Sequence, residues 1–153
     1  MPGARAAMAI SEISEMNWHS RRTAFAILAG IPAAFVTAAI AVAQANGYIA
    51  AAFKMKADAE RAGDQPYGAV VVSGEEIVGW GPSRVVTRND PTAHAEREAI
   101  RDAQRRLGKQ DLSGSILYST SRPCALCERA AAEAKVARMI HGASAIDAGA
   151  PRL

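Results

Sequence analysis

Cysteine is scarce in this chain of 153 residues, which contains only two, both in the short motif Cys124-Ala125-Leu126-Cys127. Two cysteines are too few for a disulfide scaffold of the kind found in small secreted domains. A large excess of charge is also missing, because the formal net charge is only +3. Such a small positive surplus permits contact with nucleic acid but does not argue for it. The sequence shows no internal repeat, and its length is that of one globular domain.

Charged residues are absent from positions 23–53, which follow Ser20-Arg21-Arg22. A basic start, an alanine-rich apolar stretch and two small-x-small sites within 41–45 are the three parts of a secretory signal. The paired arginines give it a twin-arginine character. We therefore predict a signal over residues 1–45 and a periplasmic or otherwise exported protein. The alternatives are an ordinary core helix and an uncleaved membrane anchor, since about 20 apolar residues span a bilayer; only an anchor implies a membrane partner.

The remainder, residues 46–153, alternates helical and extended patterns. Predicted helices cover 48–62, 90–107 and 124–135, and predicted strands cover 67–72, 77–80, 116–119 and 136–140. This order starts with a helix and a hairpin and continues with strands that are separated by helices, which predicts a three-layer α/β/α sandwich with a mixed sheet. Asp90 or Thr92 is the expected cap of the second helix. No element is predicted after Gly142.

Cys124 and Cys127 are three residues apart at the start of a predicted helix, so both sulfurs can reach one metal ion. The pair alone is equally compatible with a redox disulfide. His94, at the start of another predicted helix, supplies a third ligand. Three protein ligands leave the fourth tetrahedral position of zinc open for water, as in catalytic sites. Zinc lowers the pKa of that water to roughly 7, and Glu96 can take its proton and pass it on.

These residues also form a known pattern. His94-x-Glu96 followed by Pro123-Cys124-x-x-Cys127 is the signature of the zinc deaminases. Together with the segments 66–72, 89–96, 116–120 and 123–127, it makes the chain resemble the cytidine and deoxycytidylate deaminase superfamily. The chain is most similar to the branch of guanine deaminases and bacterial tRNA adenosine deaminases, whose run D-P-T-A-H-A-E stands at 90–96. Positions 99–112 are particularly similar to guanine deaminases.

The resemblance implies a cytidine-deaminase-like sandwich that holds zinc through His94, Cys124 and Cys127. It assigns catalysis to Glu96, which would shuttle protons while zinc-bound hydroxide attacks the amino-bearing ring carbon. The backbone amide of Cys124 would help to position the water. Candidate substrate contacts are Tyr67, Ser83, Asn89 and Ala95.

Three departures from the family pattern bear on the substrate. Ser83 stands where the family often has an asparagine that contacts the purine, and Arg122 stands where it commonly has glutamate. The chain also stops at Leu153, whereas relatives continue with a further helix or strand that covers the substrate. A short C-terminus predicts a more open pocket, or one that a second copy completes. We expect a homodimer.

The favoured function is therefore zinc-dependent hydrolytic deamination of a free base or nucleoside, with guanine or a related purine first. The alternative is a tRNA adenosine deaminase, which an export signal opposes because tRNA is cytoplasmic. A third hypothesis is a non-catalytic zinc-binding domain, or an exported thiol pair, in which Cys124 and Cys127 would form a disulfide.

Overall fold

The computed structural model describes residues 33–153. The predicted basic region of the signal, including Ser20-Arg21-Arg22, lies outside the described residues. The unit of residues 40–153 contains the whole sheet. In the part of the chain that the structure describes, no helix combines the length and the hydropathy needed to cross a bilayer.

The elements follow one another in the predicted order, with one strand added at the end. They are α1 (Ala33–Arg61), β1 (Gly68–Ser73), β2 (Glu76–Pro82), α2 (Ala95–Leu107), β3 (Ile116–Ser119), α3 (Ala125–Glu133), β4 (Arg138–His141) and β5 (Ile146–Gly149). The strands form one sheet in the order β2-β1-β3-β4-β5. The β3–β4 pair is parallel and the other neighbouring pairs are antiparallel. The mixed sheet is thus confirmed, and α3 is the crossover that its one parallel pair requires.

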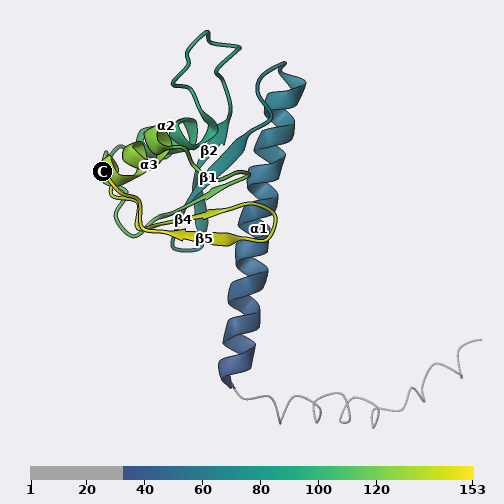
Figure 1. The fold of residues 1–153 in the computed structure, drawn as a ribbon. Helices are drawn as coiled ribbons and strands as arrows, with labels where there is room; N and C mark the ends of the chain where they lie inside the picture. Colours follow the sequence, from purple (N-terminus) through teal and green to yellow (C-terminus); the bar gives the residue numbers. More distant parts are fainter. Residues whose placement is uncertain (1–32) are drawn as a thin grey trace, which may run out of the picture. The chain divides into compact units, whose positions relative to one another are not determined.

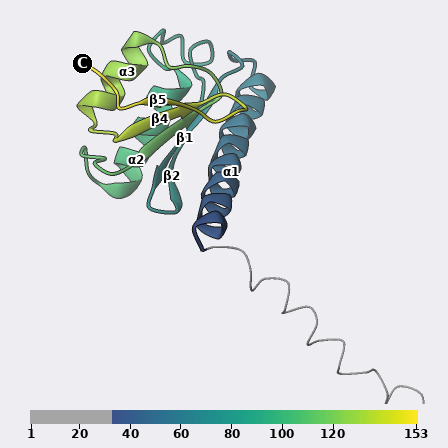
Figure 2. The same ribbon diagram turned by 60° about the horizontal axis from the view of Figure 1, so that its bottom comes forward.

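Helices cover both faces of the sheet, as Figures 1 and 2 show. Alternate residues of β1 point to opposite faces. Val70 and Val72 pack with Ile49 and Met55 of α1, whereas Ala69 and Val71 pack in a second cluster with buried residues of α2 and α3. The three predicted layers are therefore present in residues 40–153.

Helix α1 begins earlier than predicted. The expected start was Tyr48, but the helix is continuous from Ala33 and passes through the small-x-small sites at 41–45. Ala45 packs against the cluster that lies under α1. An alanine-rich apolar run matches the middle of an export signal, but alanine is also the strongest helix former, and composition cannot separate the two.

Two boundaries near the site also differ from the prediction. Helix α2 starts at Ala95, because Asp90 accepts a hydrogen bond from the Thr92 amide at 2.8 Å and closes a turn instead of capping the helix. The tail forms strand β5, which pairs with β4 across a turn in which Gly142 and Ala145 have positive φ angles of 74° and 49°. A four-residue strand without a buried residue carries too little periodicity to be recognised in the sequence.

Helix α2 lies so close to strand β2 that no side chain fits between them. A Cβ atom at Gly81 would stand 2.1 Å from the carbonyl oxygen of Ala95, and one at Gly79 would stand 2.3 Å from that of Ala99. On the helix side the contact is made by alanines that are at most 1% exposed. Small residues on both elements thus set the spacing between helix and sheet, and with it the position of the first turn of α2.

Replacing Gly81 with alanine should therefore lower the free energy of unfolding by about 1–3 kcal/mol, because the obstructing atoms are backbone and cannot rotate away. The measurement is urea denaturation followed by circular dichroism. Gly47→Ala is the matched control, since a Cβ there meets nothing within 4 Å and should raise the stability of α1 by up to about 1 kcal/mol. Equal unfolding midpoints for Gly81→Ala and the wild type would contradict this account of the spacing.

Candidate metal and catalytic site

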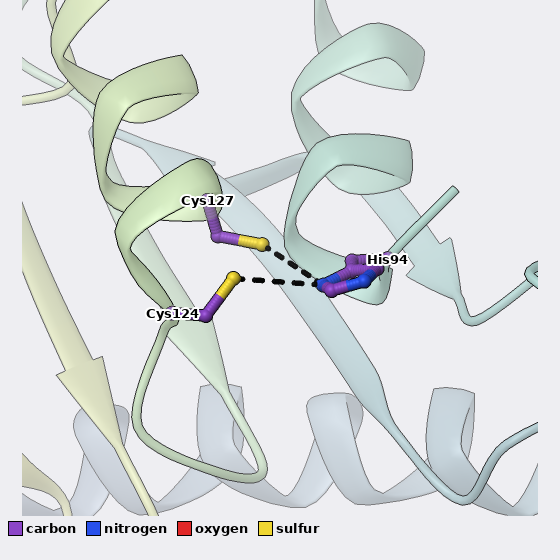
Figure 3. A group of neighbouring side chains, drawn as sticks. All are labelled: His94, Cys124 and Cys127. Carbon is purple, nitrogen blue, oxygen red and sulfur yellow. Dashed lines mark hydrogen bonds between the residues drawn. The ribbon is translucent and has the colours of Figure 1, made fainter. Parts of the chain in front are cut away.

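The three predicted metal ligands lie at the first residues of two helices. His94 is the N-cap of α2 and Cys124 is the N-cap of α3, both with extended backbone, and Cys127 lies one turn into α3. The carbonyl of His94 accepts a hydrogen bond from the Glu98 amide, and that of Cys124 accepts one from the Glu128 amide. These bonds begin the two helices and fix the backbone of both ligands. The predicted convergence of two helix starts is thus present (Figure 3).

The donor atoms stand at separations that suit zinc. Nδ1 of His94 lies 3.6 Å from Sγ of Cys124 and 3.5 Å from Sγ of Cys127 (Figure 3). All three donor atoms lie within 4.8 Å of one another. Zinc binds sulfur at about 2.3 Å and nitrogen at about 2.0 Å, so a nitrogen and a sulfur of one tetrahedral site are roughly 3.5 Å apart. Both cysteines are free thiols, and the set fits a zinc ion with three protein ligands.

Glu96 stands beside this group without belonging to it. It is the second residue of α2 and only 6% exposed. The thiol of Cys127 donates a hydrogen bond to its Oε2 at 3.4 Å. Burial raises the pKa of Glu96 above its usual value. A buried carboxyl group of this kind holds a proton more readily than an exposed one, which suits a group that both takes and gives a proton.

The thiol of Cys127 is held in its protonated form while no cation is bound. Burial raises its pKa, and the neighbouring carboxylate of Glu96 adds to the effect. Zinc binds the thiolate, so metal binding has to release this proton. The N-terminus of α3 favours the release, because the helix dipole stabilises negative charge in the first turn.

A cavity of about 590 Å³ opens at the site. Its lining comprises Gln65, Tyr67, His94, Glu96, Ser121, Arg122 and Cys124. Tyr67 therefore lies where a substrate contact was predicted. The contributions of Gln65 and Ser121 were not predicted, although each is within two residues of a position that the sequence had singled out. Size and lining fit a small-molecule site, for which roughly 300–1,000 Å³ is typical.

The other predicted substrate contacts lie elsewhere. Among the described residues, the lining of this cavity does not include Ser83, Asn89 or Ala95. Ser83 is 2% exposed and borders a separate hollow of about 360 Å³, together with Trp80. Asn89 adopts a φ of 49° in the loop before α2, and Ala95 is buried in the core between α2 and the sheet. These positions shape the surroundings of the site and do not border its cavity.

Asp64 is a structural residue that the sequence did not reveal. Its Oδ1 accepts hydrogen bonds from the Ser83 hydroxyl and the Gln65 amide, each at 2.8 Å. Its Oδ2 accepts bonds from the amides of Val86 and Thr87 and from the Thr87 hydroxyl. Burial would raise the pKa of Asp64, but these hydrogen bonds outweigh it and hold the pKa well below its usual value. One ionised carboxylate therefore fastens the loop that leads to His94.

Known proteins resemble this chain in both sequence and fold. The sequence profile of the cytidine and deoxycytidylate deaminase zinc-binding region matches residues 42–143. A tRNA-specific adenosine deaminase of Buchnera aphidicola is 41% identical over 86 residues, which are 56% of this chain and 57% of the relative. A guanine deaminase of Bacillus subtilis is 42% identical over 83 residues, 54% of this chain and 53% of that protein.

Among solved structures, one from a study of tRNA:A34 deaminases superposes with a TM-score of 0.61 at 33% identity. The superposition covers 63% of this chain and 70% of that chain. The matched part spans little more than half the length of the curated relatives named above.

These relatives correct the predicted location. The expectation of a periplasmic, exported or membrane-anchored protein is wrong, because the chain matches tRNA-specific adenosine deaminases of several bacteria. The apolar, alanine-rich stretch after the paired arginines misled the prediction. Its described portion, from Ala33 onward, is part of helix α1.

Zinc binding should depend on the three ligands and on no other histidine. We expect about one zinc ion per chain in the wild type, and well under half of that in His94→Asn and Cys127→Ser, since two ligands bind zinc far more weakly than three. His141→Asn is the matched control, because His141 lies at the end of β4 and outside the cluster. Native mass spectrometry of protein purified without a reducing agent gives both the metal content and the oxidation state of the cysteines. Wild type that carries a Cys124–Cys127 disulfide and no zinc would support the thiol-pair hypothesis instead.

Asp64→Asn should lower the free energy of unfolding by roughly 2–4 kcal/mol at neutral pH. The reason is that the NH2 group of asparagine cannot accept the hydrogen bonds that backbone amides donate to the Asp64 carboxylate. Since the pKa of Asp64 is lowered in the folded state, its contribution is complete above the unfolded pKa of about 4 and disappears as the pH falls toward the folded value. The gap between variant and wild type should therefore narrow below about pH 4. Urea titrations at pH 6 and pH 3.5 measure it.

The control for this experiment is Asp58→Asn, which removes an ion pair with Arg61 on the surface of α1. A pair of this kind contributes at most about 1 kcal/mol. A gap between Asp64→Asn and the wild type that stays constant across the pH range would contradict the depressed pKa.

Proposed function

The chain belongs to the cytidine and deoxycytidylate deaminase superfamily, and we propose that it removes the exocyclic amino group of a nucleobase by hydrolysis, with guanine or a related purine as the first candidate. The observation that carries the proposal is the complete site: three zinc donors at tetrahedral spacing with the buried carboxyl group of Glu96 beside them. The 42% identity to a guanine deaminase supports the purine.

A zinc ion at this site supplies Lewis acidity and lowers the pKa of water. Hydrolysis replaces the amino group with oxygen from water and releases ammonia, so protons have to move from the water to the ring nitrogen and to the leaving amine. Glu96 is the acidic side chain in the cavity lining, and its carboxyl group would carry these protons. Its raised pKa favours the proton-bearing state that the second transfer needs.

Adenosine within tRNA is the second candidate. The tRNA-specific relative matches the chain as closely as the guanine deaminase does, at 41% identity. The cavity also carries Tyr67, which is 44% exposed. Exposed aromatic rings are the surfaces on which bases stack once they have left a nucleic-acid strand. The same four site residues would serve either substrate.

Ammonia release from guanine, guanosine, adenosine, cytidine and tRNA tests the proposal. Glu96→Gln should lower the rate on whichever substrate reacts by at least about 100-fold, because the amide cannot transfer protons. Zinc content should stay at the wild-type level, since Glu96 is not a ligand. Glu133→Gln, at the exposed end of α3, is the matched control and should leave the rate unchanged. No ammonia from any substrate with the zinc-loaded wild type would overturn the proposal.

A further inference from the structure

Arg122 lines the cavity of the candidate site, where a bound ligand can reach it. It lies in the loop between β3 and α3 and lines the cavity that also contains His94 and Glu96. Its neighbours hold this loop in place: the Thr120 amide donates to the Gly68 carbonyl at 2.9 Å, and the Ser119 hydroxyl donates to the Ser121 carbonyl at 2.7 Å. The backbone is therefore fixed on the N-terminal side, and α3 begins directly after Pro123.

The charge of Arg122 is not neutralised by the protein. Most arginines of the described chain form ion pairs with carboxylates; these are Arg61, Arg84, Arg88, Arg101, Arg105, Arg106, Arg138 and Arg152. Within residues 33–153, the structure gives no such partner to Arg97, Arg122 or Arg129. Of these three, only Arg122 lines the cavity at the metal site.

Two uncharged polar side chains also line the cavity. Gln65 and Ser121 line it with Arg122, and the structure records no hydrogen bond from either of their side chains to another described residue. Glu96 is the one acidic residue in this lining, and it is buried beside the metal ligands. An unpaired guanidinium in a cavity that also offers an amide and a hydroxyl group is suited to an anion, and its planar fork matches phosphate in particular.

We propose that Arg122 binds a phosphate group of the substrate, so that the base that is deaminated enters this site on a phosphorylated sugar and not as a free base. The inference rests on the proposed function, and it narrows the substrate to a nucleotide. The phosphate is either the monoester of a free nucleotide or the diester of a nucleic-acid strand. Both present the same oxygens to the guanidinium, and the experiment separates them.

The test compares ammonia release from guanine, guanosine and guanosine 5′-monophosphate, from adenosine and adenosine 5′-monophosphate, and from a short single-stranded RNA. The proteins are the wild type, Arg122→Gln, Arg122→Lys and Arg129→Gln, all loaded with zinc. Arg129 is the matched control, because it is an exposed, unpaired arginine on α3 outside the cavity lining. Binding of ribose 5-phosphate to each protein, by calorimetry, reports on the phosphate site without any reaction.

In the wild type, the phosphorylated form of the reactive base should have the higher kcat/KM. Arg122→Gln should lower that value about 10- to 100-fold and change the value for the unphosphorylated nucleoside by less than about twofold. Arg122→Lys should lower kcat/KM by less than Arg122→Gln does, since lysine keeps the positive charge but lacks the planar pair of donors of the guanidinium. Arg129→Gln should match the wild type. An effect confined to the monophosphates identifies the monoester, and an effect confined to the RNA identifies the diester.

Equal kcat/KM for nucleoside and nucleotide in the wild type, or a preference that survives in Arg122→Gln, would overturn the inference and leave the proposed deaminase function intact. Failure of every substrate to release ammonia would count against the function itself. In that case the binding of ribose 5-phosphate tests the role of Arg122. Weaker binding by Arg122→Gln than by Arg129→Gln supports a phosphate site at Arg122, and equal binding by the two variants excludes such a site.

Discussion

The contact between helix α2 and strand β2 fixes the backbone that carries His94 and Glu96. Two glycines on the strand face small side chains on the helix, and the carbonyl oxygen of Ala95 approaches Gly81 so closely that a methyl group would not fit. His94 and Glu96 flank that alanine in the sequence. Their positions therefore depend on backbone packing, which is far less adjustable than a contact between flexible side chains. A catalytic group needs this kind of support, because small displacements of reacting atoms are costly.

The buried carboxylates of Asp64 and Glu98 both stabilise the loop that precedes α2. Asp64 accepts five hydrogen bonds from its neighbours and from Ser83, Val86 and Thr87. Glu98, 3% exposed, accepts bonds from Arg88 at 2.7 Å and from Arg101 at 2.8 Å. Hydrogen bonds to ionised groups are among the stronger ones in proteins. A loop that holds no regular secondary structure is thereby given one conformation, and it delivers His94 to the site.

The sequence predicted the element order and the neighbourhood of Cys124 and Cys127 because both depend on short-range spacing, whereas His94 was joined to the two cysteines by the zinc-deaminase motif. Cys124 and Cys127 had to share a helix face, and the alternation of apolar runs with helical ones specified the layers. The place of Ser83 in the fold could not be predicted, for a different reason. Its position along the chain suggests a substrate contact, but its hydroxyl bonds to Asp64, and no local pattern reports such a partner. The early start of α1 and the short strand β5 were missed because alanine-rich and very short segments satisfy more than one structural pattern.

The two helix starts that carry the ligands have one more property. His94 and Cys124 occupy N-cap positions, but neither side chain makes the hydrogen bond that usually closes a helix there. In most helices this bond contributes about 1 kcal/mol. A metal ion coordinated by both residues would stabilise the first turns of α2 and α3 in place of these hydrogen bonds. Removing the ion with a chelator would therefore destabilise the starts of both helices. Metal binding and the stability of these first turns would then be thermodynamically coupled, so a substitution that weakens one would also weaken the other.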